Sequence, residues 1–170
     1  MKKRILLALF LVFVMLFAFT ACDDDDDDSR ACTEEDYEII CAILEACEDA
    51  AEDDDYYTYS VSGTTMTITF KDYTCTAESI IDESDISVTI ESGSTLKYVY
   101  NSSSGSAVWT FDIDATVDGT SHSLYLKYTT YDDDDEDNTI SKIELDGVEL
   151  TGFDDIDSSV RALASRTFAV

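Results

Sequence analysis

The chain of 170 residues has no proline, one histidine and only ten basic residues. Without proline, its turns have to be made by Gly, Asn, Asp and Ser. The single histidine, His122, restricts Ser-His-Asp and Cys-His catalysis to one position, beside a turn where we expect an exposed polar side chain. No Gly-rich phosphate-binding loop is present either. We therefore do not expect an enzyme.

Basic residues are outnumbered by 38 acidic ones, which gives a formal net charge of −28. A charge of this sign opposes binding to nucleic acid and to an anionic membrane surface, and it favours solubility and cation binding. High charge is also typical of disorder, but here apolar and aromatic residues are plentiful and alternate in regular patterns. We predict one folded domain with charged loops and no nucleic-acid partner.

The one long apolar run lies at the N-terminus. A basic start, MKKR, precedes an uncharged stretch over residues 5–19, which ends in Phe19-Thr20-Ala21-Cys22. This order is typical of a secretory signal, and the run is too short for a stable membrane span. The ending resembles the lipobox of bacterial lipoprotein precursors, with Phe19 in place of the usual aliphatic residue.

That resemblance implies that the Cys22 thiol receives a diacylglycerol and that the chain is cut before it. Acyl chains such as palmitate would then hold the protein at the membrane, on the periplasmic face or the cell surface. The implied organisation is a signal peptide over 1–21, an acidic linker over 22–31 and one globular domain over 32–170. The alternative is an ordinary secreted protein cut near Ala21, with Cys22 free or in a disulfide.

Four more cysteines follow the linker: Cys32, Cys41, Cys47 and Cys75. Export into an oxidising compartment favours one or two disulfides among them. Zinc is the rival interpretation, but no Cys-x-x-Cys pair is present. Cys41 and Cys47 would be about 10 Å apart in a helix, and a disulfide needs less than about 7 Å. Cys75 is therefore expected to pair with a helical cysteine, and we favour Cys47.

The remaining pattern predicts one helix followed by strands. Thr33 and Asp36 approximate a capping box, and the helix should run over about 33–52. Its apolar stripe has 3–4 spacing: Tyr37, Ile40, Leu44, Cys47 and Ala51. Over 56–151 the period changes to two, with short turns such as Asp118-Gly119 between segments. This alternation predicts strands over 56–61, 65–70, 86–90, 96–100, 109–117, 124–128, 143–145 and 148–150. The predicted fold is α+β, with the N-terminal helix packed on a curved antiparallel β-meander or a partly closed barrel.

One acidic loop has the spacing of a calcium site. Asp133, Asp135 and Asp137 are followed by Thr139 and Glu144, which resembles the EF-hand loop of oxygen ligands ending in a bidentate Glu. Asn138 replaces the usual Gly, and the flanks are strand-like. The competing interpretation is a solvated hairpin loop. No other cofactor is expected.

Tyrosines lie on or beside many of the predicted strands: Tyr56, Tyr57, Tyr59, Tyr98, Tyr100, Tyr125, Tyr128 and Tyr131. They either pack in the sheet or form an exposed binding face. We interpret the chain as a non-enzymatic, lipid-anchored binding module of the cell envelope, with a protein or small-molecule partner. The alternatives are a periplasmic carrier or chaperone for an apolar ligand and a calcium-binding lipoprotein.

Overall fold

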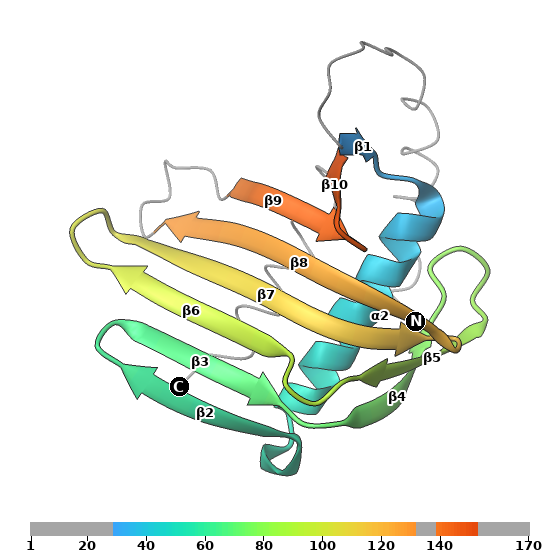
Figure 1. The fold of residues 1–170 in the computed structure, drawn as a ribbon, viewed down its shortest axis with the longest axis horizontal. Coiled ribbons are helices and arrows are strands. Elements are labelled where there is room, and N and C mark those ends of the chain that lie inside the picture. The colour runs from blue at the N-terminus through green and yellow to red at the C-terminus, as the bar shows by residue number, and fades with distance from the viewer. Residues whose placement is uncertain (1–28, 132–138, 153–170) are drawn as a thin grey trace, which may run out of the picture.

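The computed structural model describes residues 29–131 and 139–152. These residues form one sheet of ten strands, one α-helix, α2 (Glu34–Ala51), and a 3-10 turn, η1 (Asp54–Tyr56) (Figure 1). The strands are β1 (Ser29–Ala31), β2 (Tyr57–Ser62), β3 (Thr65–Phe70), β4 (Tyr73–Glu78), β5 (Asp85–Ile90), β6 (Thr95–Asn101), β7 (Ser106–Val117), β8 (Thr120–Tyr131), β9 (Thr139–Leu145) and β10 (Val148–Thr151). The predicted α+β class is confirmed.

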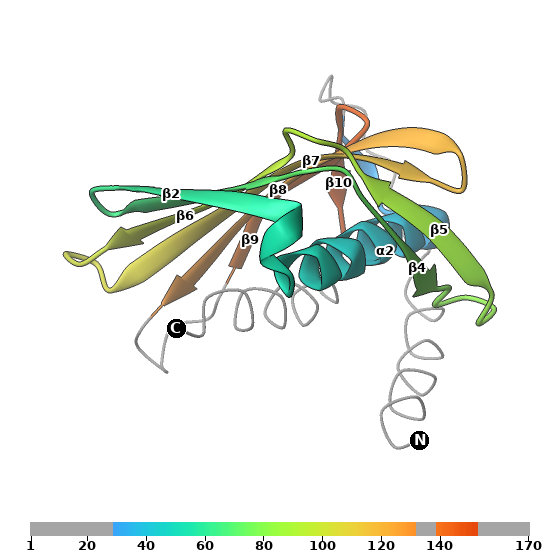
Figure 2. The same cartoon turned by 90° about the horizontal axis from the view of Figure 1, so that it is seen from below.

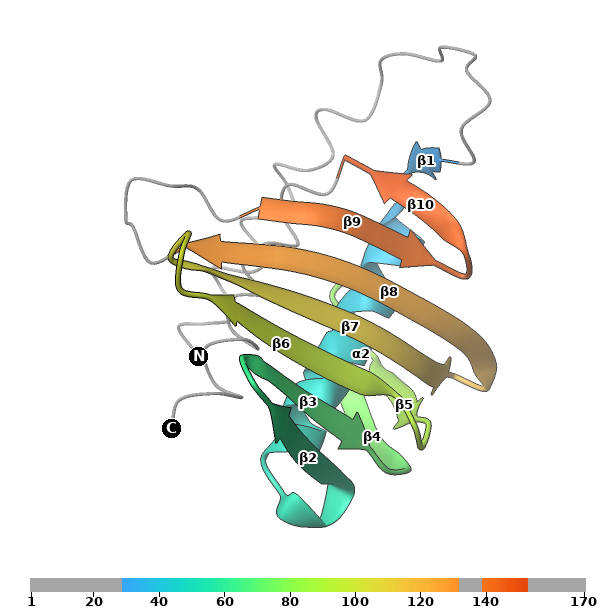
Figure 3. The ribbon, with the colours of Figure 1, turned by 60° about the vertical axis from the view of Figure 1, so that its left-hand side comes forward.

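The sheet is open. Its strand order is β1-β10-β9-β8-β7-β6-β3-β2, so β1 and β2 lie at opposite ends, and among the described residues it does not close into a barrel (Figure 3). The twelve-residue strand β7 pairs with β8 along its whole length. On its other edge, β6 pairs with the first half of β7, and β5 pairs with residues 115–117. The sheet therefore divides at the middle of β7.

Three pairings differ from a simple meander, namely β3 with β6, β5 with β7, and β1 with β10. β3 pairs with β6 instead of β4, because the β4–β5 hairpin lies between them in the chain but turns away from β3. β4 itself was not among the predicted strands. β1 pairs in parallel with β10, with Arg30 opposite Leu150, although the sequence placed Ser29–Ala31 in the acidic linker. The folded region of the described chain thus begins before the predicted boundary at Cys32.

The start of α2 is held by the predicted capping box. The Thr33 side chain accepts a hydrogen bond from the Asp36 amide at 3.2 Å, and the Asp36 carboxylate accepts from the Thr33 amide at 2.8 Å. Both terminal guanidinium nitrogens of Arg30 in β1, Nη1 and Nη2, also donate to Asp36, with Nη2 at 2.7 Å. The Arg30 hydrogen bond, with a smaller contribution from Thr33, holds the pKa of Asp36 well below its usual value, while burial acts in the opposite direction. One buried carboxylate therefore links β1 to the helix.

The core lies between α2 and the inner side of the bent sheet, where the helix contacts β4, β5 and β7 (Figure 2). Strand β7 shows the predicted alternation, with buried Trp109, Phe111 and Ile113 separated by half-buried Thr110 and exposed Asp112. Burying each large apolar side chain contributes about 1.5–3 kcal/mol. In the described part of the chain, no helix is both long and apolar enough to cross a membrane.

Candidate functional site

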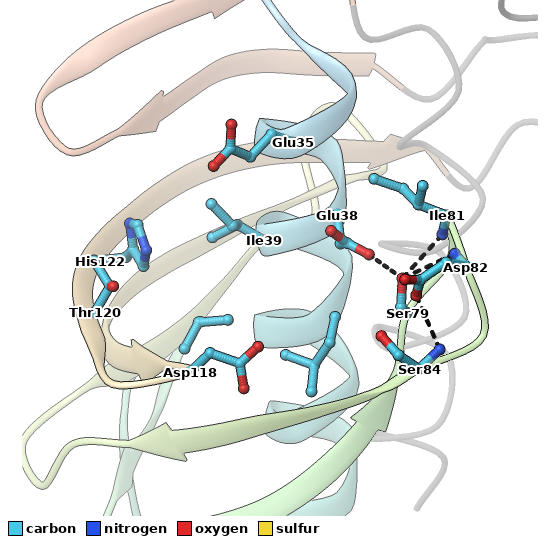
Figure 4. A pocket seen from close by; sticks show the side chains of 12 residues that line it. Glu35, Glu38, Ile39, Ser79, Ile81, Asp82, Ser84, Asp118, Thr120 and His122 are labelled. Carbon is cyan, nitrogen blue, oxygen red and sulfur yellow. Dashed lines mark hydrogen bonds between the residues drawn. The ribbon is translucent and has the colours of Figure 1, made fainter.

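A cavity of about 330 Å³ lies between the first half of α2, the loop that joins β4 to β5, and the turn that joins β7 to β8 (Figure 4). The helix contributes Glu35, Glu38 and Ile39 to its lining. The β4–β5 loop contributes Ser79, Asp82 and Ser84, the β7–β8 turn contributes Asp118, and the start of β8 contributes Thr120 and His122. The site is thus assembled from three segments that are distant in the sequence.

Ser79 organises the β4–β5 side of the cavity. Its buried hydroxyl donates to the Glu38 carboxylate of α2 and accepts from the amides of Ile81 (3.1 Å) and Asp82 (3.2 Å). The Ser79 amide also donates to the Ser84 carbonyl at 2.7 Å, which closes the loop. Hydrogen bonds from Ser84 lower the pKa of Asp82. The loop is therefore tied to the helix and presents an ionised carboxylate at neutral pH.

The opposite side of the cavity is built on the β7–β8 turn. Asp118 adopts a left-handed backbone (φ +47°) and exchanges two hydrogen bonds of 2.9 Å with Ser87: its carboxylate accepts from the Ser87 amide, and its own amide donates to the Ser87 carbonyl. These contacts fix the turn against β5. Asp118 thereby becomes a positioned carboxylate instead of a mobile surface charge.

His122 lies on the side of β8 that faces the helix, on the same face as the buried Leu124 and Leu126. Its side chain is only 13% exposed, and Nδ1 lies 2.8 Å from the Asp146 carboxylate. The sequence led us to expect an exposed position instead. Because Nδ1 is engaged by Asp146, Nε2 is the ring nitrogen that a ligand in the cavity would meet.

The cavity lining is acidic. It contains four carboxylates, those of Glu35, Glu38, Asp82 and Asp118, and neither lysine nor arginine. Across the residues that the structure describes, no group of three or more His, Cys, Asp or Glu side chains is placed to hold a metal ion. The four carboxylates come from α2, the β4–β5 loop and the β7–β8 turn, so negative charge lies on several sides of the cavity.

The structure brings together two of the predicted disulfide cysteines. Cys47 is fully buried on α2, and Cys75 is half-buried on β4, the strand that packs against that helix. Burial, and then the neighbouring Cys75, raises the pKa of Cys47. Burial likewise raises the pKa of Cys75 to about 11 and that of Cys32 to about 11. Cys41 is half-buried on α2. The Cys47–Cys75 bond stays a prediction, and the proximity of the two residues is consistent with it.

The other predicted sites are only partly within the described residues. Cys22, Asp133, Asp135 and Asp137 lie outside them. Thr139 begins β9 and is exposed. The Glu144 carboxylate pairs with Lys142 Nζ at 2.8 Å, on the face of β9 opposite the buried Ile143 and Leu145. The calcium loop therefore stays a prediction, and its last ligand already has a cationic neighbour.

No protein-family model matches this chain, and neither the search of curated proteins nor that of solved structures found a match. The cavity was missed by the sequence reasoning because its polar residues do not form a local motif. The only local signal was the Asp118-Gly119 turn, which we recognised as a turn but not as the wall of a site.

Proposed function

We propose that this protein is a lipid-anchored binding module of the cell envelope whose cavity takes an organic cation, such as the ammonium or guanidinium group of a polyamine or a basic side chain. The observation that carries the proposal is the cavity of about 330 Å³ lined by four carboxylates and no basic residue. Its volume falls at the lower end of the range for small-molecule sites, about 300–1,000 Å³.

The fold supports a binding role because it supplies a rigid frame. We infer that the N-terminal helix packed on the curved sheet is the platform, with the β4–β5 loop and the β7–β8 turn held against it by Ser79 and Asp118. A preformed site loses less conformational entropy on binding than a flexible one. The apolar carrier is less well supported, because the space between α2 and the sheet is filled by buried side chains.

Calorimetric titration of the full-length chain with spermidine tests the cavity, with triethylene glycol as an uncharged probe of similar length. The Asp118→Asn variant keeps the size of the side chain and tolerates the left-handed turn, but it removes one charge from the cavity. We expect it to weaken spermidine binding about fivefold, since a unit charge about 4 Å away contributes about 1 kcal/mol in water. The matched control is Asp112→Asn, an exposed carboxylate of β7 outside the cavity, which should leave binding unchanged.

Two outcomes would contradict the cavity as the site. The first is equal weakening by Asp118→Asn and Asp112→Asn, which would mean that spermidine responds only to the overall negative charge. The second is equal binding of triethylene glycol, which would mean that charge is not recognised at all.

The membrane anchor is tested separately at Cys22. Cys22→Ser should abolish incorporation of labelled fatty acid and leave uncleaved precursor, because the thiol is the atom that accepts the lipid. Continued labelling together with normal processing would exclude the lipoprotein assignment. The binding role of the cavity could still hold in that case, as a secreted protein would retain it.

A further inference from the structure

Strand β2 is an open edge of the sheet. It pairs with β3 on one side, and no other strand of the described residues pairs with its outer side. The hydrogen bond from the Lys71 amide to the Tyr56 carbonyl (2.8 Å) fixes which residues bond to β3. In an antiparallel pair, every second residue of a strand bonds to its partner strand, and the residues between point their N–H and C=O groups the other way. The backbone groups of Tyr57, Tyr59 and Val61 therefore point away from β3. The edge therefore offers alternating donors and acceptors.

The side chains of β2 are unusual for a sheet edge in so acidic a protein. Tyr59 is 69% exposed and Val61 is 65% exposed, and both lie on one face of the strand. With Tyr56, they make up three of the four exposed large hydrophobic residues in the described chain. The fourth, Ile81, lies in the β4–β5 loop. Exposed apolar side chains thus gather along this edge.

The usual devices that block an edge strand are missing from β2. Natural sheets protect edges with charged side chains, proline, bulges or very short strands. β2 contains no charged residue and no proline, and its six residues pair with β3 in an unbroken register. The edge at the other end of the strand order differs, since β1 has three residues and carries Arg30, which is bound to Asp36. Only one end of the strand order is therefore suited to accept another strand.

The charges near β2 indicate what kind of strand would add. Asp53, Asp54 and Asp55 lie just before β2 in the chain, with Tyr56 between, and are exposed. The nearby Lys71 uses its ammonium group to bond the Asp55 carbonyl at 2.7 Å. A basic side chain at this end of an added strand would meet three carboxylates. A second copy of the chain would instead bring another net charge of −28.

We propose that the β2 edge binds an extended segment of a partner protein as an additional antiparallel strand, with uncharged side chains along Tyr57–Ser62 and basic residues beside Asp53–Asp55. Backbone hydrogen bonds to Tyr57, Tyr59 and Val61 supply the affinity, as in other cases of strand addition. Alternate apolar side chains of the segment pack on Tyr59 and Val61. The basic residues come last in the segment, because antiparallel pairing puts its C-terminal end beside the start of β2. This surface is separate from the acidic cavity.

The test uses a fluorescent peptide, Thr-Val-Thr-Val-Thr-Lys-Lys, blocked at both ends, and the full-length chain. The matched peptide ends in Glu-Glu. Anisotropy measures affinity, and amide hydrogen exchange measures protection at each β2 residue. We expect the Lys-Lys peptide to bind at least tenfold more tightly than the Glu-Glu peptide. Saturation should slow exchange at Tyr57, Tyr59 and Val61 at least tenfold and leave Thr58 and Ser60 unchanged, since these already bond to β3.

Variants locate the binding to the edge. Tyr59→Pro removes a backbone N–H that points away from β3, and it leaves every hydrogen bond between β2 and β3 in place. This variant should therefore abolish peptide binding and keep the fold, which circular dichroism checks. Val61→Lys adds a repelling charge to the edge, keeps every backbone group and tests the proposal even where the proline variant fails to fold. Ile81→Lys is the matched control for an exposed apolar side chain elsewhere, and Asp118→Asn is the control for the cavity. Both controls should bind the peptide as the parent chain does.

Three results would overturn the proposal. One is that the protein is saturated with the Lys-Lys peptide but the amides of β2 are not protected from hydrogen exchange. Another is equal affinity for the Lys-Lys and Glu-Glu peptides, which would exclude a basic partner. The last is dimerisation without peptide, seen by light scattering and accompanied by protection of the β2 edge, which would assign the edge to a second copy of the chain.

Discussion

Replacing Asp36 by alanine should destabilise the domain more than any other single change in the first turn of α2. Asp36 is buried and accepts four hydrogen bonds, two from Arg30, one from the Thr33 amide (2.8 Å) and one from the Thr33 hydroxyl (2.6 Å). Removal of the carboxylate leaves the Thr33 amide and the Arg30 guanidinium without this acceptor. It also breaks the capping box that starts the helix.

The magnitude follows from these contacts. Leaving a partly buried amide without its acceptor costs about 1–3 kcal/mol, which overlaps with a cap contribution of about 0.5–2 kcal/mol. The Arg30 side chain is 45% exposed, so solvent screens its ion pair, which adds at most about 1 kcal/mol. The sum is about 1–4 kcal/mol. At about 3 °C per kcal/mol for a chain of this size, the melting temperature should fall by roughly 3–12 °C.

The stabilisation that the Asp36 carboxylate provides should decrease as the pH falls. The unfolded chain protonates Asp36 near its ordinary pKa, whereas the folded protein holds that pKa lower through Arg30 and Thr33. The stabilisation is therefore complete above about pH 4 and is lost as the pH falls through the folded pKa. In Asp36→Asn the side chain does not titrate. The difference in melting temperature between the parent chain and this variant should be constant from pH 5 to 7 and should shrink below pH 4.

Thermal denaturation followed by circular dichroism at 0.1 M salt measures both effects. Glu34→Ala is the matched control, because Glu34 is an exposed acid of the same turn without these bonds, and it should cost only about 0.3–1 kcal/mol through the helix dipole. The reasoning fails if Asp36→Ala melts within 2 °C of the parent chain or no lower than Glu34→Ala. A difference that stays unchanged down to pH 2 would refute the pKa argument.

Two further predictions concern the core and one turn. Oxidised glutathione, which takes up two electrons and two protons to become two molecules of reduced glutathione, should join Cys47 to Cys75. The bond should stabilise the fold by about 3–4 kcal/mol for a separation of 28 residues (75 − 47). Peptide mass spectrometry checks the bond, and any other pairing of Cys75 would contradict it. Gly93→Ala should cost about 1–3 kcal/mol, because Gly93 has φ +100° where its amide bonds the Phe70 carbonyl at 3.0 Å. An unchanged melting temperature would show that the turn relaxes freely.

The parts of the fold that could be predicted are those that depend on local pattern. The strict alternation around Phe111 and Ile113 identified β7, and Thr33 with Asp36 identified the start of α2. β4 was missed because two of its three inward residues, Cys75 and Ala77, are too small to give a strong alternating signal. Short turns correctly indicated antiparallel neighbours, but they could not show that β3 would pair with β6 across an intervening hairpin.

The candidate site could not be predicted for a related reason. Glu38, Ser79 and Asp118 belong to a helix, a loop and a turn, and each is an ordinary residue in its own segment. Only the bend of the sheet and the position of α2 bring them to one cavity. In a chain with 38 acidic residues, composition does not distinguish a positioned carboxylate from a solvated one. The same obstacle applies to β1, whose Arg30 is recognised as structural only when its contact with Asp36 is seen.

The parallel pair of β1 and β10 has a consequence for the order of folding. It joins residues 29–31 to residues 149–151, so the first described strand cannot find its partner until nearly the whole domain is present. Contacts of such high sequence separation form late, whereas the β7–β8 hairpin is local and can form early. A chain that is exported N-terminus first would therefore cross the membrane with its sheet incomplete. Strand β10, the last strand of the described residues, would then pair with β1 beside the proposed anchor.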